Sequence, residues 1–491
     1  MRCLPVGGFV VRPNGEDGEE QRTPLAGSCP VLGRVNCSPE SQTAAGRSGI
    51  LATVDLHMSG LGKHTIDLSP LRVSRDFRLM WTGNTVSAVG SMLTRVAGPL
   101  QVYDLTHSSW TVGLTGLFSL GPVMVCSVFG GAVADVADKR WMLVRGLLIG
   151  TVLALLLTLN AATTPRLWVL YLLAAVVGAN GAFMAPASRS AVPALLPPEL
   201  FPAAQALQML TFTGASVLAP ALAGLLVRSV GAKWTYAIDA ISYAACFVSV
   251  TRMRPIPSAN KDGRFHPRLV LEGFRSLKGR HAVQGSFVAD LIAMIFGMPM
   301  ALFPALAAAR FAHHEKLVGL LYAALPFGAM LATVLSGWTR RVTRHGRVVV
   351  LSVVVWGLAI TGLGLVHGIV LSLLFLAVSG AADSVSGVSR SAMLQLATPP
   401  TLQGRMQGVG MAVWICGPYL GDFEAGGVAA LTSVDTSILL GGIACVVGIL
   451  GLSAALPAFS RFDAKHANEA DVGPEDPAAE VVDEPVVSAG T

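Results

Sequence analysis

Long apolar segments, separated by short polar turns, make up most of this chain. Each segment is close to the roughly 20 residues that a helix needs to cross a bilayer, and none alternates apolar and polar residues as a half-buried strand would. The pattern predicts an all-α integral membrane protein with twelve transmembrane helices in two six-helix bundles. The segments fall at about 77–102, 110–133, 141–161, 166–187, 202–228, 233–251, 284–309, 317–338, 347–367, 369–389, 406–431 and 435–458.

The composition agrees with this pattern. Only 13% of the 491 residues are charged and 53% are hydrophobic. A soluble domain carries roughly 25% charged residues, so most of this chain avoids water. The 53 glycines suit helices in lipid, because small residues let their backbones approach closely.

The two ends of the chain lack the apolar pattern. Residues 1–70 are rich in Gly, Pro, Ser and charge, which predicts a disordered extension; one alternative is that the natural chain starts near Met58. Residues 461–491 are a second predicted disordered tail, with eight acids and one Lys from Asp463 onwards.

Basic residues gather in alternate connections between the apolar segments, which predicts that both termini are cytoplasmic. The richest connection, 253–283, is a predicted basic linker along the membrane surface. It joins an N-terminal bundle at 71–252 to a C-terminal bundle at 284–460. Outside the linker, these basic residues are Arg72, Arg75, Arg78, Lys139, Arg140, Arg340, Arg341, Arg344 and Arg347. This distribution accounts for the net charge of +6, so no nucleic-acid partner is expected.

The two halves of the chain resemble each other. Four matches occur in the same order, at offsets of 201 to 206 residues, which favours an internal repeat over chance. A parallel repeat of two six-helix halves is the arrangement of a rocking carrier. The matches join Gly113-Leu114 with Gly319-Leu320, Gly131 with Gly337, Arg189 with Arg390 in two Arg-Ser-Ala triplets, and Pro197 with Pro399 in two Pro pairs.

The sequence has no pattern typical of an enzyme or of a metal site. Its seven cysteines have neither metal-ligand nor redox spacing, and four lie in apolar segments as small hydrophobic residues. It contains no phosphate-binding glycine loop, zinc-binding His pair or nucleophile elbow. We therefore expect no cofactor, no use of ATP by this chain and no enzymatic activity.

Several motifs resemble the major facilitator superfamily. Residues 131–140 resemble its second-to-third loop signature: a Gly, an Asp four residues on, and a basic pair. Gly214, Pro220 and Gly224 in the fifth segment resemble its antiporter signature and are candidate helix-packing residues. Val136 stands where the loop signature has a base, and Ala219 and Ala223 stand where the antiporter signature has Gly.

Other segments resemble the enterobactin-exporter-like branch of that superfamily. This resemblance implies efflux of a siderophore or a drug-like molecule. The segments are 184–189, 337–347, 380–390 and 417–426.

The charged loop after the second segment is the predicted gate. A carboxylate at the end of a helix can bind a facing helix N-terminus or an arginine, and so hold one state closed; the resemblance implies the same role. The matching second-half segment has bases but no acid. Alternatives are a topology signal for the loop and lipid-facing anchors for the arginines. The gating candidates are Gly131, Asp135, Lys139, Arg140, Arg189 and Arg390.

Ionisable residues inside the apolar segments are candidates for proton coupling or for lining a cavity. A charge in hydrocarbon costs at least about 2.5–3.5 kcal/mol, so it faces a cavity or a partner. Burial also favours the protonated form of a carboxyl group. The arginine is the candidate for an anionic or carbonyl-bearing substrate, and the alternative for each carboxylate is a structural pair. The candidates are Arg95, Asp239, Asp290, Asp383, Asp422 and Glu424.

Together these features predict a secondary active transporter, a monomer in the cell membrane. It exports an amphipathic small molecule by alternating access, coupled to protons. An uptake permease for a metabolite is the alternative within transport. An integral-membrane enzyme and a non-transporting sensor are the alternatives outside it. An enzyme would need clustered polar residues at one interface and a large soluble loop, and the sequence has neither.

Overall fold

The computed structural model describes residues 67–256, 277, 279–311, 317–337, 342–399 and 402–464. All of them belong to one compact unit, Ile66–Thr491. The predicted N-terminal extension, most of the basic linker and most of the acidic tail lie outside the described residues. So do the side chains of Ala132, Asp135, Gly404 and Arg405, which lie on described helices.

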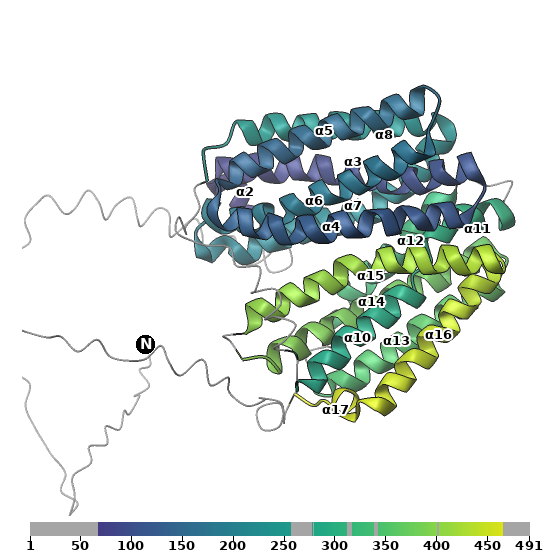
Figure 1. The fold of residues 1–491 in the computed structure, drawn as a ribbon. Coiled ribbons are helices and arrows are strands. Elements are labelled where there is room, and N and C mark those ends of the chain that lie inside the picture. The colour runs from purple at the N-terminus through teal and green to yellow at the C-terminus, as the bar shows by residue number, and fades with distance from the viewer. Residues whose placement is uncertain are drawn as a thin grey trace, which may run out of the picture. The chain divides into compact units, whose positions relative to one another are not determined.

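The first half of the described chain is a bundle of six long helices, drawn from purple to teal in Figure 1. A short helix α2 (Ser69–Val73) precedes them, and one 3-10 turn, η3 (Pro198–Leu200), leads into the fifth. The six are α3 (Arg75–Thr106), α4 (Ser109–Val136), α5 (Lys139–Ala162), α6 (Leu167–Leu195), α7 (Phe201–Ser229) and α8 (Ala232–Thr251).

The second half forms a similar bundle, drawn from green to yellow in Figure 1. Its first predicted span is broken into two helices around a 3-10 turn, and a short helix, α17 (Pro457–Ser460), follows the last span. The elements are α10 (His281–Phe296), η4 (Met300–Leu302), α11 (Phe303–Arg310), α12 (Val318–Val334), α13 (His345–Leu365), α14 (Ile369–Leu396), α15 (Gln403–Leu431) and α16 (Val434–Ala455).

Every predicted apolar segment coincides with a helix or with the broken span, and the described residues contain no strand. The all-α membrane class is therefore confirmed. Eight segments are long and apolar enough to cross a membrane by length and composition, while α12 is apolar but shorter. Helices α3, α8 and α15 fall outside these eight, and they carry the exposed Arg95, the buried Asp239 and the half-buried Asp422. The count of twelve spans stays a prediction.

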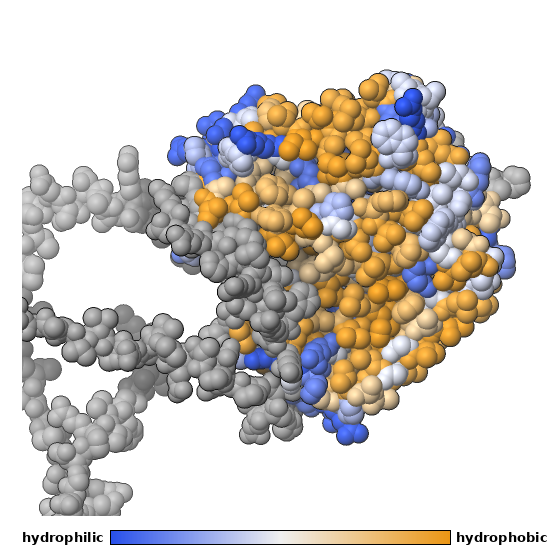
Figure 2. Space-filling model, in the orientation of Figure 1, coloured by the Kyte–Doolittle hydropathy of each residue, from blue (hydrophilic) through white to orange (hydrophobic). Residues whose placement is uncertain are grey.

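The surface of the bundles matches a lipid environment. Figure 2 shows hydrophobic residues over the middle of the face in view and hydrophilic residues toward the ends of the helices. Large apolar side chains such as Leu351, Val370 and Leu431 are more than half exposed. Many such side chains on one surface are typical of helices that face lipid.

The break in the seventh span leaves polar backbone groups that side chains from three other helices satisfy. Trp356 of α13 donates its indole N–H to the carbonyl oxygen of Gly297, at 2.7 Å. The Tyr322 hydroxyl of α12 donates to the carbonyl of Met300, at 3.0 Å. Asp422 accepts a hydrogen bond from the Ala301 N–H, at 3.0 Å. A broken helix persists in a membrane only when such groups find partners.

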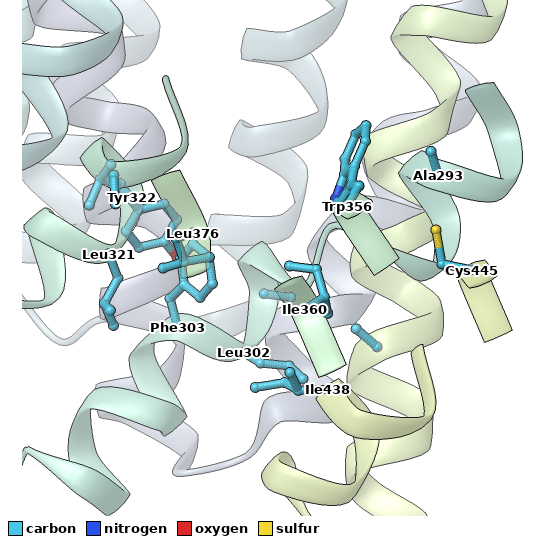
Figure 3. Packing of buried hydrophobic residues seen from close by; sticks show 14 of the residues in the cluster. Ala293, Leu302, Phe303, Leu321, Tyr322, Trp356, Ile360, Leu376, Ile438 and Cys445 are labelled. Carbon is cyan, nitrogen blue, oxygen red and sulfur yellow. The ribbon is translucent and has the colours of Figure 1, made fainter. Parts of the chain in front are cut away.

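Apolar packing around this break fixes the core of the second bundle. Trp356 and Phe303 are fully buried, and the rings of Phe303 and Tyr322 meet edge to face with centroids 4.9 Å apart. Figure 3 shows Leu302, Phe303 and Tyr322 gathered on one side of this core and Trp356 near Ala293 on the other. The break is thus held by both hydrogen bonds and packing.

The two bundles meet through α4 against α15 and α7 against α12. We call the end of the bundles at which α4 and α12 begin the closed end, because the backbones touch there. A Cβ atom on Gly113 of α4 would lie 2.6 Å from the carbonyl oxygen of Asp422, and one on Gly319 of α12 would lie 2.9 Å from the Gly224 nitrogen. Glycine is required at both places, since any side chain would push the helices apart.

We call the opposite end, at which α5 and α13 begin, the basic end. Lys139 and Arg140 begin α5 there, Arg344 is the N-cap of α13, and Arg189 lies six residues before the end of α6. This is the side on which the sequence concentrates its positive charge.

Candidate functional site

Arg390 of α14 lies between two carboxylates inside the second bundle. Its Nη1 atom is 2.6 Å from Oδ1 of Asp290 in α10, and its Nη2 atom is 3.9 Å from Oδ1 of Asp383 in α14. The side chains of Arg390 and Asp290 are only 12% and 10% exposed. The shorter contact is an ion pair without hydrogen-bond alignment. The sequence predicted all three residues separately, and the structure brings them together as one cluster.

This cluster can change its pairing when a proton arrives. One cation shared by two carboxylates leaves a net negative charge, which is costly in a low-dielectric interior. A proton on one carboxylate removes that excess and leaves Arg390 attracted to the other. Since the two acids lie on different helices, α10 and α14, such a change alters the contacts between these helices.

Arg95 projects from the middle of α3 toward the other bundle. It is exposed, yet it acts electrostatically on Tyr419 and Asp422 of α15 and on Tyr243 of α8. The exposed guanidinium therefore faces the space between the bundles rather than lipid. Among the described residues it forms no salt bridge, so its charge is available to a ligand.

Asp239 has a different environment. Its carboxylate is buried, and it accepts hydrogen bonds from the hydroxyls of Thr94, at 2.6 Å, and Ser242, at 3.2 Å. A Cβ atom on Gly90 would lie 2.7 Å from its Oδ1 atom. The carboxylate thus joins α3 to α8 inside the first bundle, away from the Arg390 cluster.

Asp422 and Glu424 lie two residues apart on α15 and have different environments. Asp422 accepts the hydrogen bond from the broken seventh span and has its own backbone against Gly113 of α4. Glu424 is half-buried. Asp422 is therefore placed at the contact between the bundles.

The basic pair of the predicted gate binds helices of its own bundle. Lys139 donates to the carbonyl of Ser190 in α6, at 3.2 Å, and Arg140 donates to the carbonyl of Thr251 at the end of α8, at 2.6 Å. Gly131 has open space where a Cβ would stand. Asp135 lies in the last turn of α4, and its side chain is not among those described. In this conformation the pair holds α5, α6 and α8 together at the basic end.

The repeat-related arginines occupy unlike environments. Arg390 is buried between acids, whereas Arg189 is exposed at the basic end of α6. One Arg189 nitrogen lies 3.5 Å from the sulfur of Met411 in α15, which belongs to the other bundle. Arg390 is therefore the one of the two whose contacts can change when a neighbouring carboxylate gains or loses a proton.

The three candidate helix-packing residues of α7 also lie in unlike environments. Pro220 and Gly224 are buried against Gly319 of α12, so they help to form the closed end. Gly214, ten residues before Gly224, has open space where a Cβ would stand. The packing role fits the first two residues and not the third.

Sequence reasoning missed some residues of the site. Tyr419 lies in the segment 417–426 without being singled out there and Tyr243 lies in no motif, so only the structure shows that both interact electrostatically with Arg95. Arg310, 3% exposed, pairs with Asp435 at 2.6 Å and donates to the carbonyl of Gly364 at 2.8 Å. An arginine at the end of an apolar segment was the available signal for this junction.

Comparison with known proteins gives the family. A family model described as a transmembrane secretion effector matches residues 65–485. The chain belongs to this family of the major facilitator superfamily. The predicted superfamily is therefore confirmed.

Relatives and solved structures agree with this assignment. The enterobactin exporter EntS of Escherichia coli is 32% identical over 394 residues, which cover 78% of this chain and 93% of the exporter. The relative of that name in Shigella boydii has the same identity and coverage. The solved nucleoside transporter NupG has a TM-score of 0.63 at 15% identity, covering 77% of this chain and 98% of that chain.

A second solved structure is a bacterial homologue of the human lysosomal transporter Spinster. It has a TM-score of 0.61 at 14% identity, covering 82% of this chain and 98% of its own. At these identities the solved structures establish the fold. The chain is a multi-pass membrane transporter of a small molecule and not an enzyme, as predicted.

Proposed function

We propose that this protein is a proton-coupled exporter of an amphipathic, siderophore-like small molecule. Export and cargo class follow from relatives that are named enterobactin exporters and cover most of the chain. We place the transporter in the cell membrane as a monomer, with both termini in the cytoplasm. The basic end then faces the cytoplasm, as the distribution of Lys and Arg favours.

The observation that carries the coupling is the cluster of Asp290, Arg390 and Asp383. A coupled carrier needs a titratable group whose protonation changes the contacts between helices. Asp290 and Asp383 meet this condition, because they lie on α10 and α14 and share the cation of Arg390. Protonation of Asp383 would leave Arg390 paired with Asp290 of α10 alone. Deprotonation of Asp383 would restore its attraction for Arg390.

Arg95 is the proposed contact for the cargo. It is an exposed cation in a transmembrane helix, facing the other bundle beside Tyr419 and Tyr243. A guanidinium that faces the other bundle suits an anionic group of the cargo, which can pair with the charge. This environment favours an acidic cargo over a neutral sugar or a metal cation.

The described conformation is closed toward the outside if the basic end is cytoplasmic. Gly113 and Gly319 bring the two bundles into backbone contact at the other end. Release of cargo outside then requires α4 to leave α15 and α7 to leave α12. Asp135, Gly131, Lys139 and Arg140 would stabilise the opposite, inward-closed state, in which the basic ends of the bundles approach.

The test uses the full chain in liposomes that carry a pH-sensitive dye. Enterobactin is added on the side of the basic end, and proton movement is recorded with cargo movement. We expect cargo to leave that side while protons enter it, and Asp383→Asn to abolish the proton movement. Arg95→Gln should weaken cargo binding by about tenfold, the value of one charge-assisted contact.

The matched control is Asp104→Asn. Asp104 pairs with Arg228 at 3.0 Å, at the closed end and outside the Arg390 cluster. This variant should retain coupled export. Cargo movement toward the basic end would instead indicate an uptake permease. Unchanged proton movement in both Asp383→Asn and Asp290→Asn would exclude the cluster as the coupling site.

A further inference from the structure

A pocket lies at the start of α13, at the basic end and outside the proposed transport site. Its volume is about 250 Å³. It is lined by Val342, Thr343, Arg344, Arg347, Val348 and Leu351. The lining combines two cations with an apolar wall, and the transport proposal uses none of these residues.

The pocket continues into an apolar stripe along α13. Arg344, the N-cap residue of α13, and Arg347, in its first turn, are both exposed. Leu351, Leu358 and Leu365 follow on the same face, at 65%, 56% and 64% exposure. Residues three, four and seven apart share one face of a helix. The charged groups therefore lie directly above a continuous apolar track that enters the membrane.

The last described residues of the chain bind the backbone next to this pocket. The Ala464 N–H donates to the carbonyl of Thr343, at 2.8 Å, and the Gly346 N–H donates to the carbonyl of Phe462, at 3.4 Å. Asp463 lies 3.7 Å from Arg344, whose side chain is 63% exposed. An ion pair this exposed is weak, so Arg344 remains open to a stronger anion.

We propose that this pocket binds an anionic phospholipid. The headgroup phosphate lies between Arg344 and Arg347, and one acyl chain follows Val348 and Leu351 down the face of α13. Two cations above an apolar track match an anionic headgroup above a hydrocarbon chain, and arginine binds phosphate with two parallel donors.

The acidic tail that begins after Ala464 is the competing occupant. It could satisfy the two charges, because it carries carboxylates. It could not cover Leu351 and Leu358 as well, since peptide groups without partners do not lie against lipid-facing helices. The charge and the apolar track together therefore favour the lipid.

The test measures lipid binding to the purified full chain in detergent. Phosphatidylglycerol and phosphatidylcholine are added separately, and the lipid molecules retained are counted by native mass spectrometry, with the melting temperature as a second readout. The parent should retain phosphatidylglycerol and gain thermal stability from it, and phosphatidylcholine should do neither. The double variant Arg344→Gln, Arg347→Gln should bind phosphatidylglycerol at least tenfold more weakly.

The matched control is Arg254→Gln. Arg254 is exposed at the basic end beyond α8 and does not line the pocket. This variant should bind phosphatidylglycerol as the parent does, and so should a chain that ends at Ala464. Equal binding by the double variant and the parent would overturn the proposal. Binding that appears only after the tail is removed would also overturn it, in favour of the tail.

Discussion

Gly113 of α4 and Asp422 of α15 are in backbone contact, so close that a Cβ atom at position 113 would lie 2.6 Å from the Asp422 carbonyl oxygen. The repeat places an equivalent contact in the other half. There Gly319 of α12 lies against Pro220 and Gly224 of α7. Two glycines that the sequence pairs as repeat equivalents thus form the two contacts that close one end of the transporter.

Replacing either glycine should open the closed end. In Gly113→Val and Gly319→Val, the new side chain meets backbone atoms that cannot move without separating the bundles. The expected result is a shift of the population toward the open state. A single cysteine at Val112, which is 3% exposed, would then react severalfold faster with a membrane-impermeant maleimide, in a chain with its native cysteines removed.

Gly214→Val is the control for this experiment. Gly214 lies on α7 but has open space where a Cβ would stand. It should leave the labelling rate unchanged. If all three variants label alike, the glycine contacts do not set the balance between states.

Much of the fold could be predicted from the sequence, because the lengths of the apolar segments and their repeat correspond to the helices of the structure. The broken seventh span was not predicted. Its residues, Gly297 to Pro299, are apolar and read as continuous membrane helix. The partners that stabilise the break, Trp356, Tyr322 and Asp422, are more than 20 residues away along the chain.

The site was predictable in part. Asp290 and Asp383 were each identifiable as charges in apolar segments, and Arg390 as a gating candidate from the repeat. Their pairing was not, because Asp290 is 100 positions from Arg390. The basic pair Lys139 and Arg140 fits a loop signature, yet the carbonyls that it binds in α6 and α8 carry no sequence signal.

Asp422 should be required as an acceptor rather than as a charge. Its Oδ1 atom accepts the Ala301 N–H, and an asparagine keeps a carbonyl oxygen there. We expect Asp422→Asn to retain most of the transport rate. Asp422→Ala leaves the N–H of the broken span without a partner and should cost about 1–3 kcal/mol of stability.

The two variants are compared by thermal unfolding in detergent and by cargo efflux from liposomes. If Asp422→Asn loses proton movement while its melting temperature is unchanged, the charge itself has a role in coupling, and the acceptor role is secondary.

Arg310 should be sensitive even to the conservative change to lysine. Its guanidinium bonds Asp435 of α16 at 2.6 Å and the carbonyls of Leu363 and Gly364 in α13 at 2.8 Å each. A lysine ammonium is one point of charge and cannot reach these groups in the same geometry. Arg310→Lys should lower the stability by about 1–3 kcal/mol, because buried carbonyls lose their hydrogen-bond donors.

Thermal unfolding checks this prediction, with Arg228→Lys as the matched control. The Arg228 side chain is 21% exposed against 3% for Arg310, and it pairs with Asp104, which is 39% exposed; a salt bridge this exposed contributes only about 0–1 kcal/mol. Equal losses in the two variants would contradict the structural role of Arg310.

The ion pair in the Arg390 cluster should make the stability of a double variant differ from the sum of the single variants. Arg390→Gln leaves Asp290 and Asp383 without their shared cation, and breaking a buried pair in this way costs about 3–5 kcal/mol. Asp290→Asn costs less, because Arg390 keeps Asp383 at 3.9 Å. The double variant Asp290→Asn, Arg390→Gln removes one acid with the cation and should be more stable than Arg390→Gln alone.

Melting temperatures of the four proteins give the coupling energy between the two residues, and parallel flux assays separate stability from function. We expect a coupling energy of at least about 1 kcal/mol, with proton movement lost in both variants that lack Arg390. Additive stabilities would mean that the 2.6 Å contact contributes nothing in the folded protein. Proton movement that survives without Arg390 would mean that the carboxylates bind protons independently of it.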